Sequence, residues 1–216
     1  MVEKFHIELE KLKQNVLQMG ELSTSMLSTS VDALKNLDVE KAEWVNSKKK
    51  ELAKMNVDLE EEALQLIALY QPMARDMRTI ACCLKMIVDL NRIGRYGKDT
   101  ANVAKEISPG PHIKKIISIP HMNELVQSMI NDAFTAFKTG DISLIKGFTE
   151  RDNDVDSLRY SIFRECVSYM MENPVNITIC THYIMVARYL ERCGDHACDM
   201  AAEIHYMITG QRIEIK

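Results

Sequence analysis

The chain has 216 residues, of which 46% are hydrophobic, 27% charged and 6% aromatic. This composition excludes a disordered protein and predicts one or two compact domains. The formal net charge of −4 gives no overall basic surface, so we expect no nucleic-acid partner. Glycine and proline are scarce, while Ala, Leu, Met, Glu and Lys are abundant. These are the residues of long helices, and they predict an all-α protein.

The N-terminal residues carry charges and no apolar stretch, and no run approaches the roughly 18 apolar residues that a membrane helix requires. We therefore expect a cytoplasmic protein that meets a membrane only through its partners. The cysteines lie in apolar, helix-like runs, so we expect reduced core thiols and no disulfide framework. They are Cys82, Cys83, Cys166, Cys180, Cys193 and Cys198.

Capping residues and helix breakers divide the first half of the chain into three predicted helices. The first covers about residues 4–36, and Asp38 is a good N-cap for the second, which contains no Gly or Pro. Gln71-Pro72 then breaks the chain, and we expect Pro72 in the first turn of a third helix that ends near Ile107.

The same order recurs in the second half, after a predicted linker at residues 108–120. A helix over about 121–138 stops at Gly140-Asp141, where Asp141 is expected to cap the next helix. That helix ends at Asn173-Pro174, and the last one ends at Gly210. The expected architecture is two tandem three-helix bundles, residues 1–107 and 121–216.

The two halves also match residue by residue. Asp38 corresponds to Asp141 at an offset of 103, and near the ends of the third helices the offset becomes 100. An internal duplication of a three-helix unit explains these matches, with the change of offset absorbed in the turns. The pairs at the second offset are Leu90 and Leu190, Arg92 and Arg192, Gly94 and Gly194, and Asp99 and Asp199.

The last predicted helix carries a stripe of carboxylates. Glu191, Asp195 and Asp199 follow one another at intervals of four, and at about 100° per residue they point away from the apolar seam that contains Cys193. Carboxylates placed in this way repel one another unless a cation bridges them. Cys198 lies on the same face and is a candidate soft ligand.

The preceding predicted helix supplies two more acids on one face, Asp152 and Asp156. If the two helices pack antiparallel across Asn173-Pro174, these acids lie at the height of Glu191 and Asp195. Oxygen donors from adjacent helices are how helical bundles build carboxylate metal sites. A solvated acidic face is the alternative, and the spacing alone does not decide between them.

In the first half, the corresponding positions hold Lys54, Asn91 and Arg95. Two cations at these positions would repel a metal ion, and we expect Lys54 and Arg95 to pair with Asp58 and Asp99 instead. The contrast favours a metal in the second repeat and predicts an empty first repeat.

Two other chemistries are less well supported by the sequence. Cys193 and His196 have a spacing that allows zinc ligation, but a buried thiol and a boundary histidine explain them better. A carboxylate-bridged oxidase or hydrolase is a further alternative, although Gly194 stands where such sites place a histidine after Glu191. The sequence shows no nucleophile-base pairing, so we expect no enzymatic activity.

Three motifs carry a resemblance to a known family. Gln71-Pro72-Met73-Ala74-Arg75-Asp76-Met77-Arg78 resembles the QPxAxDLR turn of the PhoU family. The segments Leu90–Arg95 and Leu190–His196 look like its duplicated LERIGD motifs. The resemblance covers the whole chain and implies two three-helix bundles related by pseudo-twofold symmetry, without catalytic activity.

The resemblance also implies a function. PhoU proteins are cytoplasmic regulators of phosphate uptake that act with the phosphate-specific ABC transporter, here expected through its ATPase subunit. In bacteria they restrain a phosphate-sensing histidine kinase, which makes them negative regulators of the phosphate response. We expect a homodimer. An accessory regulator of an inorganic phosphate permease is the alternative function.

Some members of the PhoU family bind multinuclear iron or other metal clusters through ExxxD motifs and acids of the neighbouring helix. Carried over, this implies Glu191 and Asp195 as ligands, together with Asp152 and Asp156. Asp199 matches a more variable position. Iron is the first expectation, and zinc, manganese and magnesium remain alternatives because carboxylate oxygen accepts all of them.

Overall fold

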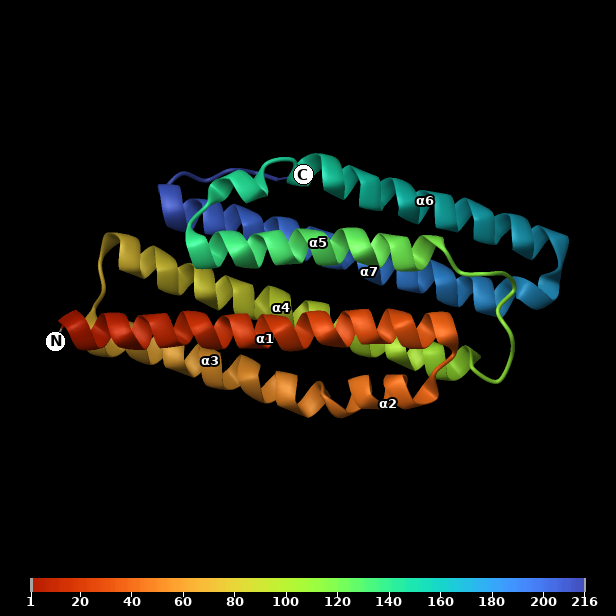
Figure 1. The fold of residues 1–216 in the computed structure, drawn as a ribbon, viewed down its shortest axis with the longest axis horizontal. Coiled ribbons are helices and arrows are strands. Elements are labelled where there is room, and N and C mark those ends of the chain that lie inside the picture. Colours follow the sequence, from red (N-terminus) through yellow and green to blue (C-terminus); the bar gives the residue numbers. More distant parts are fainter. Residues whose placement is uncertain (1, 216) are drawn as a thin grey trace.

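The computed structural model describes residues 2–215, and these residues contain helices and no strand. Long helical segments run side by side along one axis (Figure 1). This confirms the all-α prediction and its order of two three-helix units. The helices are α1 (Val2–Asn36), α2 (Val39–Ser47), α3 (Lys49–Tyr70), α4 (Ala74–Ile107), α5 (Ser118–Thr139), α6 (Phe148–Glu172) and α7 (Ile177–Thr209), with 3₁₀ turns at Ile142–Ile145 and Pro174–Asn176.

The second predicted helix is interrupted and forms α2 and α3. The break lies at Lys48, whose backbone N–H bonds to the carbonyl of Val45, three residues back, as in a tighter turn. Neither Gly nor Pro marks this position, so no strong helix breaker predicts it. Asp38 is the N-cap of α2 as expected, because its Oδ1 accepts a hydrogen bond from the Lys41 N–H at 3.0 Å.

Three helix starts differ from the predicted ones. Pro72 precedes α4, which begins at Ala74 with Met73 as its N-cap. The helix α5 begins three residues before the expected start, so Pro120 lies inside its first turn, where a missing N–H leaves no helical bond unmade. Asp141 caps the short 3₁₀ turn and not α6, which begins only after Gly147.

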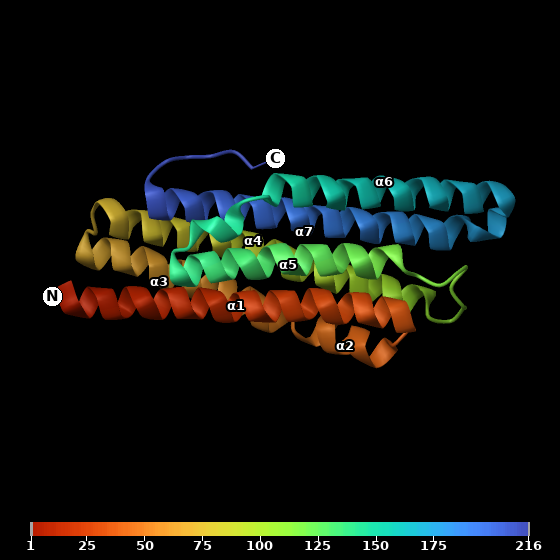
Figure 2. The same cartoon turned by 45° about the horizontal axis from the view of Figure 1, so that its top comes forward.

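The two units pack against each other through α4 and α7, and through α1 and α5. Figures 1 and 2 show α4 beside α7 in both views. The predicted apolar seam of α7 is buried, with Leu190, Cys193, Ala197 and Met200 fully inaccessible to solvent. All six cysteines are buried and free, as expected for reduced core residues. Among residues 2–215, no helix has both the length and the apolar character needed to cross a lipid bilayer.

Candidate metal centre

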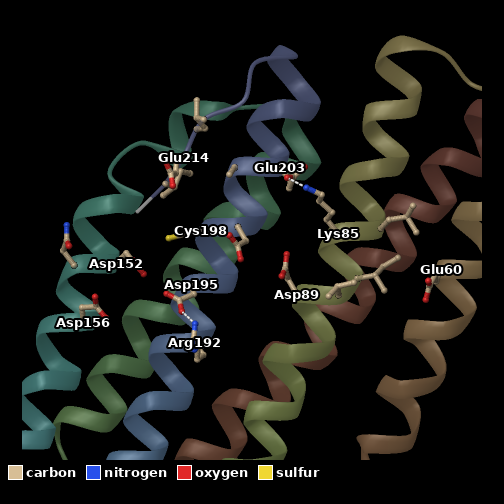
Figure 3. Close-up of a pocket in the computed structure, with 18 of the residues that line it drawn as sticks. Glu60, Lys85, Asp89, Asp152, Asp156, Arg192, Asp195, Cys198, Glu203 and Glu214 are labelled. Carbon is tan, nitrogen blue, oxygen red and sulfur yellow. Dashed lines mark hydrogen bonds and ion pairs between the residues drawn. The ribbon is translucent and has the colours of Figure 1, made fainter.

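An open groove of about 1070 Å³ runs along α7 and brings most of the predicted ligands to one wall. Figure 3 shows Asp152 and Asp156 on α6 and Asp195 on α7. Asp199, also on α7, lines the same groove. The short turn at Pro174–Asn176 makes α6 and α7 antiparallel, so the two pairs lie at similar heights. The arrangement therefore places the acids from the two predicted helices together.

Asp152 has the clearest electrostatic signature in this group. Burial raises the pKa of its carboxyl group, and the negative charges of Asp195 and Asp156 raise it further. A hydrogen bond with the Cys198 thiol acts in the opposite direction. The charges of Asp156 and Asp195 thus disfavour the ionisation of Asp152, which is a situation that a bound cation relieves.

Glu191 is more enclosed than the helical spacing suggested. Only 7% of the residue is exposed, so Glu191 is buried although the helical spacing places it away from the apolar seam. Its Oε1 pairs with Arg188 and lies 3.7 Å from Nε of Arg159. Burial raises the pKa of Glu191, opposed by Arg188, and the charges of Asp195 and Asp156 raise it further.

Oε2 of Glu191 is buried and has no hydrogen-bond partner among the described residues, which is costly for a carboxylate oxygen. Glu191 does not line the groove, however, and within residues 2–215 no three of Asp152, Asp156, Glu191 and Asp195 bring their ligand atoms within 4.8 Å of one another. Asp195 also pairs with Arg192, at 3.0 Å, on the rim of the groove.

The first repeat has a different electrostatic character at the corresponding place. A small cavity there is lined by Lys49, Asn91, Arg95 and Lys98. Asp99 pairs with Lys98 at 2.9 Å. The predicted partners are wrong, since within residues 2–215 neither Lys54 nor Arg95 forms an ion pair with Asp58 or Asp99. The wall is nevertheless cationic, as the sequence indicated.

Asp199 joins Asp89, which the sequence reasoning did not include, and His196, which it interpreted as a boundary histidine. One ligand atom each of Asp89, His196 and Asp199 lie within 4.8 Å of one another. Asp89 belongs to α4 of the first repeat and is 9% exposed. A signal was available, because Asp89 stands between the buried Met86 and Ile93 on the inner face of its helix. An acid at such a position requires a partner, and here it has His196.

The fold and the groove together define a duplicated three-helix bundle protein with an acid-lined groove along its second repeat. The PhoU domain matches the chain twice, over residues 16–104 and 119–204. The chain belongs to the PhoU family, as its motifs indicated.

Its relatives match over nearly the whole chain. A Rhizobium meliloti protein named "Phosphate-specific transport system accessory protein PhoU homolog" is 35% identical, covering 95% of this chain and 87% of the relative. A Caulobacter vibrioides protein of the same name is 34% identical, covering 98% and 93%. The crystal structure of PhoU from Pseudomonas aeruginosa superposes with a TM-score of 0.92 at 32% identity, covering 96% of this chain and all of that one.

Proposed function

We propose that this protein regulates phosphate uptake through contacts with the phosphate-specific ABC transporter. The observation that carries the proposal is the match of both repeats to PhoU, together with full-length relatives named as accessory proteins of that transport system. In this role it acts in the cytoplasm as a homodimer, binds the transporter's ATPase subunit, and restrains a phosphate-sensing histidine kinase as a negative regulator.

The partner is tested by titrating purified protein against the isolated transporter ATPase and following ATP hydrolysis and complex formation. A saturable complex supports the proposal. Cells that lack the protein should also lose the difference in phosphate uptake between phosphate-rich and phosphate-poor medium. Unchanged uptake under both conditions, together with no complex, would count against the ABC transporter and leave an inorganic phosphate permease as the partner to test.

The second part of the proposal is a metal centre held by Asp152, Asp156, Glu191 and Asp195, with Asp199 and the Cys198 thiol beside it. The fit rests on the coupled acids and on the orphaned Oε2 of Glu191. Iron is the first choice, and zinc, manganese and magnesium are alternatives because carboxylate oxygen accepts all of them. Bound there, the metal would neutralise the acids and join α6 to α7.

The metal centre is tested with the double variant Asp152→Asn and Asp195→Asn. These residues are preferred over Glu191, because replacing Glu191 would leave two arginines without their buried counter-charge. Metal content after purification without chelator should fall by at least one ion per chain. Asp154→Asn is the matched control, since Asp154 is exposed on α6 between the two groove acids in sequence. Undiminished metal in the double variant would show that the ligand assignment is wrong.

A further inference from the structure

The contact between α4 and α7 holds a second group of metal-ligating side chains that the carboxylate centre does not use. It consists of Asp89 from the first repeat and His196 and Asp199 from the second. Figure 3 shows Asp89 reaching toward α7 from the side opposite α6. We infer that these three residues form a mononuclear site for a divalent transition-metal ion, which ties the two repeats together.

The geometry of the group suits one ion. Nδ1 of His196 lies 3.0 Å from Oδ1 of Asp89. Two ligand atoms that are each about 2.1 Å from one ion, at right or tetrahedral angles, lie about 3.0 to 3.4 Å apart. Asp199 follows His196 by three residues and therefore projects from the same face of α7. Rigid helices, and not loops, hold all three donors.

The charge of the group also suits a divalent ion. Two carboxylates and a neutral imidazole carry −2, which one divalent ion balances. The groove is lined by six acidic side chains besides Asp89 and Asp199, and by only two cations, Lys85 and Arg192. Both cations have other partners, because Lys85 pairs with Glu203 and Arg192 pairs with Asp195. The surroundings therefore attract a cation, and the lining cations do not occupy its place.

The donor types select the class of ion. Imidazole nitrogen with carboxylate oxygen suits zinc, iron, manganese or cobalt better than magnesium or calcium, which prefer oxygen alone. Asp89 is nine-tenths buried, and this burial raises the pKa of its carboxyl group. The hydrogen bond with His196 lowers that pKa, but by less than burial raises it. An ion at this position would compensate a carboxylate that the fold has withdrawn from water.

The duplication shows that the site is built only once. At the offset of 100, Asp89 corresponds to Tyr189 and His196 corresponds to Tyr96. These two tyrosines stack, with ring centroids 5.5 Å apart. The pseudo-twofold axis repeats the contact between α4 and α7. At the repeated position, Tyr96 and Tyr189 thus stand in place of His196 and Asp89. The ring of Tyr96 also lies 6.1 Å from that of His196.

The first test is a zinc titration of the full chain, stripped of metal and carrying Asp152→Asn and Asp195→Asn to remove the carboxylate centre. One zinc ion should still bind. Adding Asp89→Asn, or separately His196→Gln, should weaken that affinity by at least about 100-fold, because each removes a direct ligand. Asp99→Asn is the matched control from the first repeat and should leave the affinity within about twofold.

The second test uses the wild-type chain labelled with ¹⁵N in its histidines. Zinc should shift the ring nitrogens of His196, whose resonances are assigned by their loss in His196→Gln. Any of three outcomes would overturn the site. The first is that no zinc binds to the Asp152/Asp195 double variant, and the second is that zinc binds with unchanged affinity after Asp89→Asn. The third is that the His196 ring nitrogens do not shift at zinc saturation. Loss of the carboxylate centre alone leaves this inference standing, so the two metal assignments fail separately.

Discussion

The closest backbone contact in the first repeat gives a prediction whose size can be worked out. At Gly97 in α4, a Cβ would lie 2.8 Å from the backbone N of Leu27 and 2.9 Å from the carbonyl carbon of Met26. Both atoms belong to the backbone of α1, so no side-chain rotation can relieve the contact. Gly97→Ala therefore forces α1 and α4 apart.

Two terms oppose each other in this substitution. Alanine favours a helix interior over glycine by about 1 kcal/mol. Overpacking of a well-filled core costs about 1 to 3 kcal/mol, and a backbone contact between two long helices belongs at the upper end. The net expectation is a destabilisation of about 2 kcal/mol, which lowers the melting temperature by about 4 to 8 °C for a chain of this length.

Thermal unfolding followed by circular dichroism measures this effect. Gly110→Ala is the control, because nothing lies within 4 Å of the Cβ built at Gly110, and its stability should change by no more than about 0.5 kcal/mol. A melting temperature of Gly97→Ala equal to or above that of the wild type would refute the close packing of α1 on α4. That packing matters for the site, because α4 carries Asp89.

Three further outcomes are expected. The first is measured in chelator, which removes any metal. The pKa values of Asp152 and Glu191 are raised in the native state, so the native protein binds protons at these groups more tightly than the unfolded chain does. The free energy of unfolding should therefore fall as the pH rises from about 4 through their native pKa values. Denaturation midpoints across that range should fall less steeply in Asp152→Asn, and an identical slope would contradict the coupling. All six thiols are buried, and burial raises the pKa of Cys83 to about 12. A thiol reagent should therefore modify no cysteine in the native protein and six cysteines after unfolding. Fast modification of the native protein would show that the core opens. Gly20→Ala should cost less than Gly97→Ala, since its Cβ meets only the Phe134 ring, 2.4 Å away, and melting temperatures of the two variants rank them.

The parts of the fold that were predictable from sequence depend on local signals. Asp38, Gly140 and Asn173-Pro174 mark turns because their side chains or backbone conformations end or begin helices over a few residues. The break at Lys48 was not predictable in this way. Its tight turn contains Asn46 and Ser47, which are weak helix formers, but residues of this kind also occur inside helices and do not by themselves predict a break.

The residues of the candidate site also separate into those that local sequence signals predict and those that depend on how the helices pack. The stripe on α7 and its partners on α6 follow from helical period and a short turn, and Asp152, Asp156 and Asp195 all line the groove. Their role as ligands stays a prediction. The burial of Glu191 depends on how far α6 covers it. The partnership of Asp89 with His196 joins residues 107 positions apart, and it depends on which faces of α4 and α7 meet. Helical period gives the faces of a helix but not its neighbours.

The duplication explains why the two repeats have diverged at their chemistry while keeping their packing. Apolar matches such as Leu90 and Leu190 are buried in both repeats, because each three-helix unit needs the same core. The polar positions have no such requirement, and in the first repeat Asn91 and Arg95 replace the acids. At the pseudo-twofold contact, the ligand pair occurs on one side and the tyrosine pair on the other. A metal ion at Asp89 and His196 would thus act on the boundary between the repeats, where a small change in α4 against α7 alters their relative position. Such an ion would contact both repeats, because Asp89 lies on α4 and His196 lies on α7.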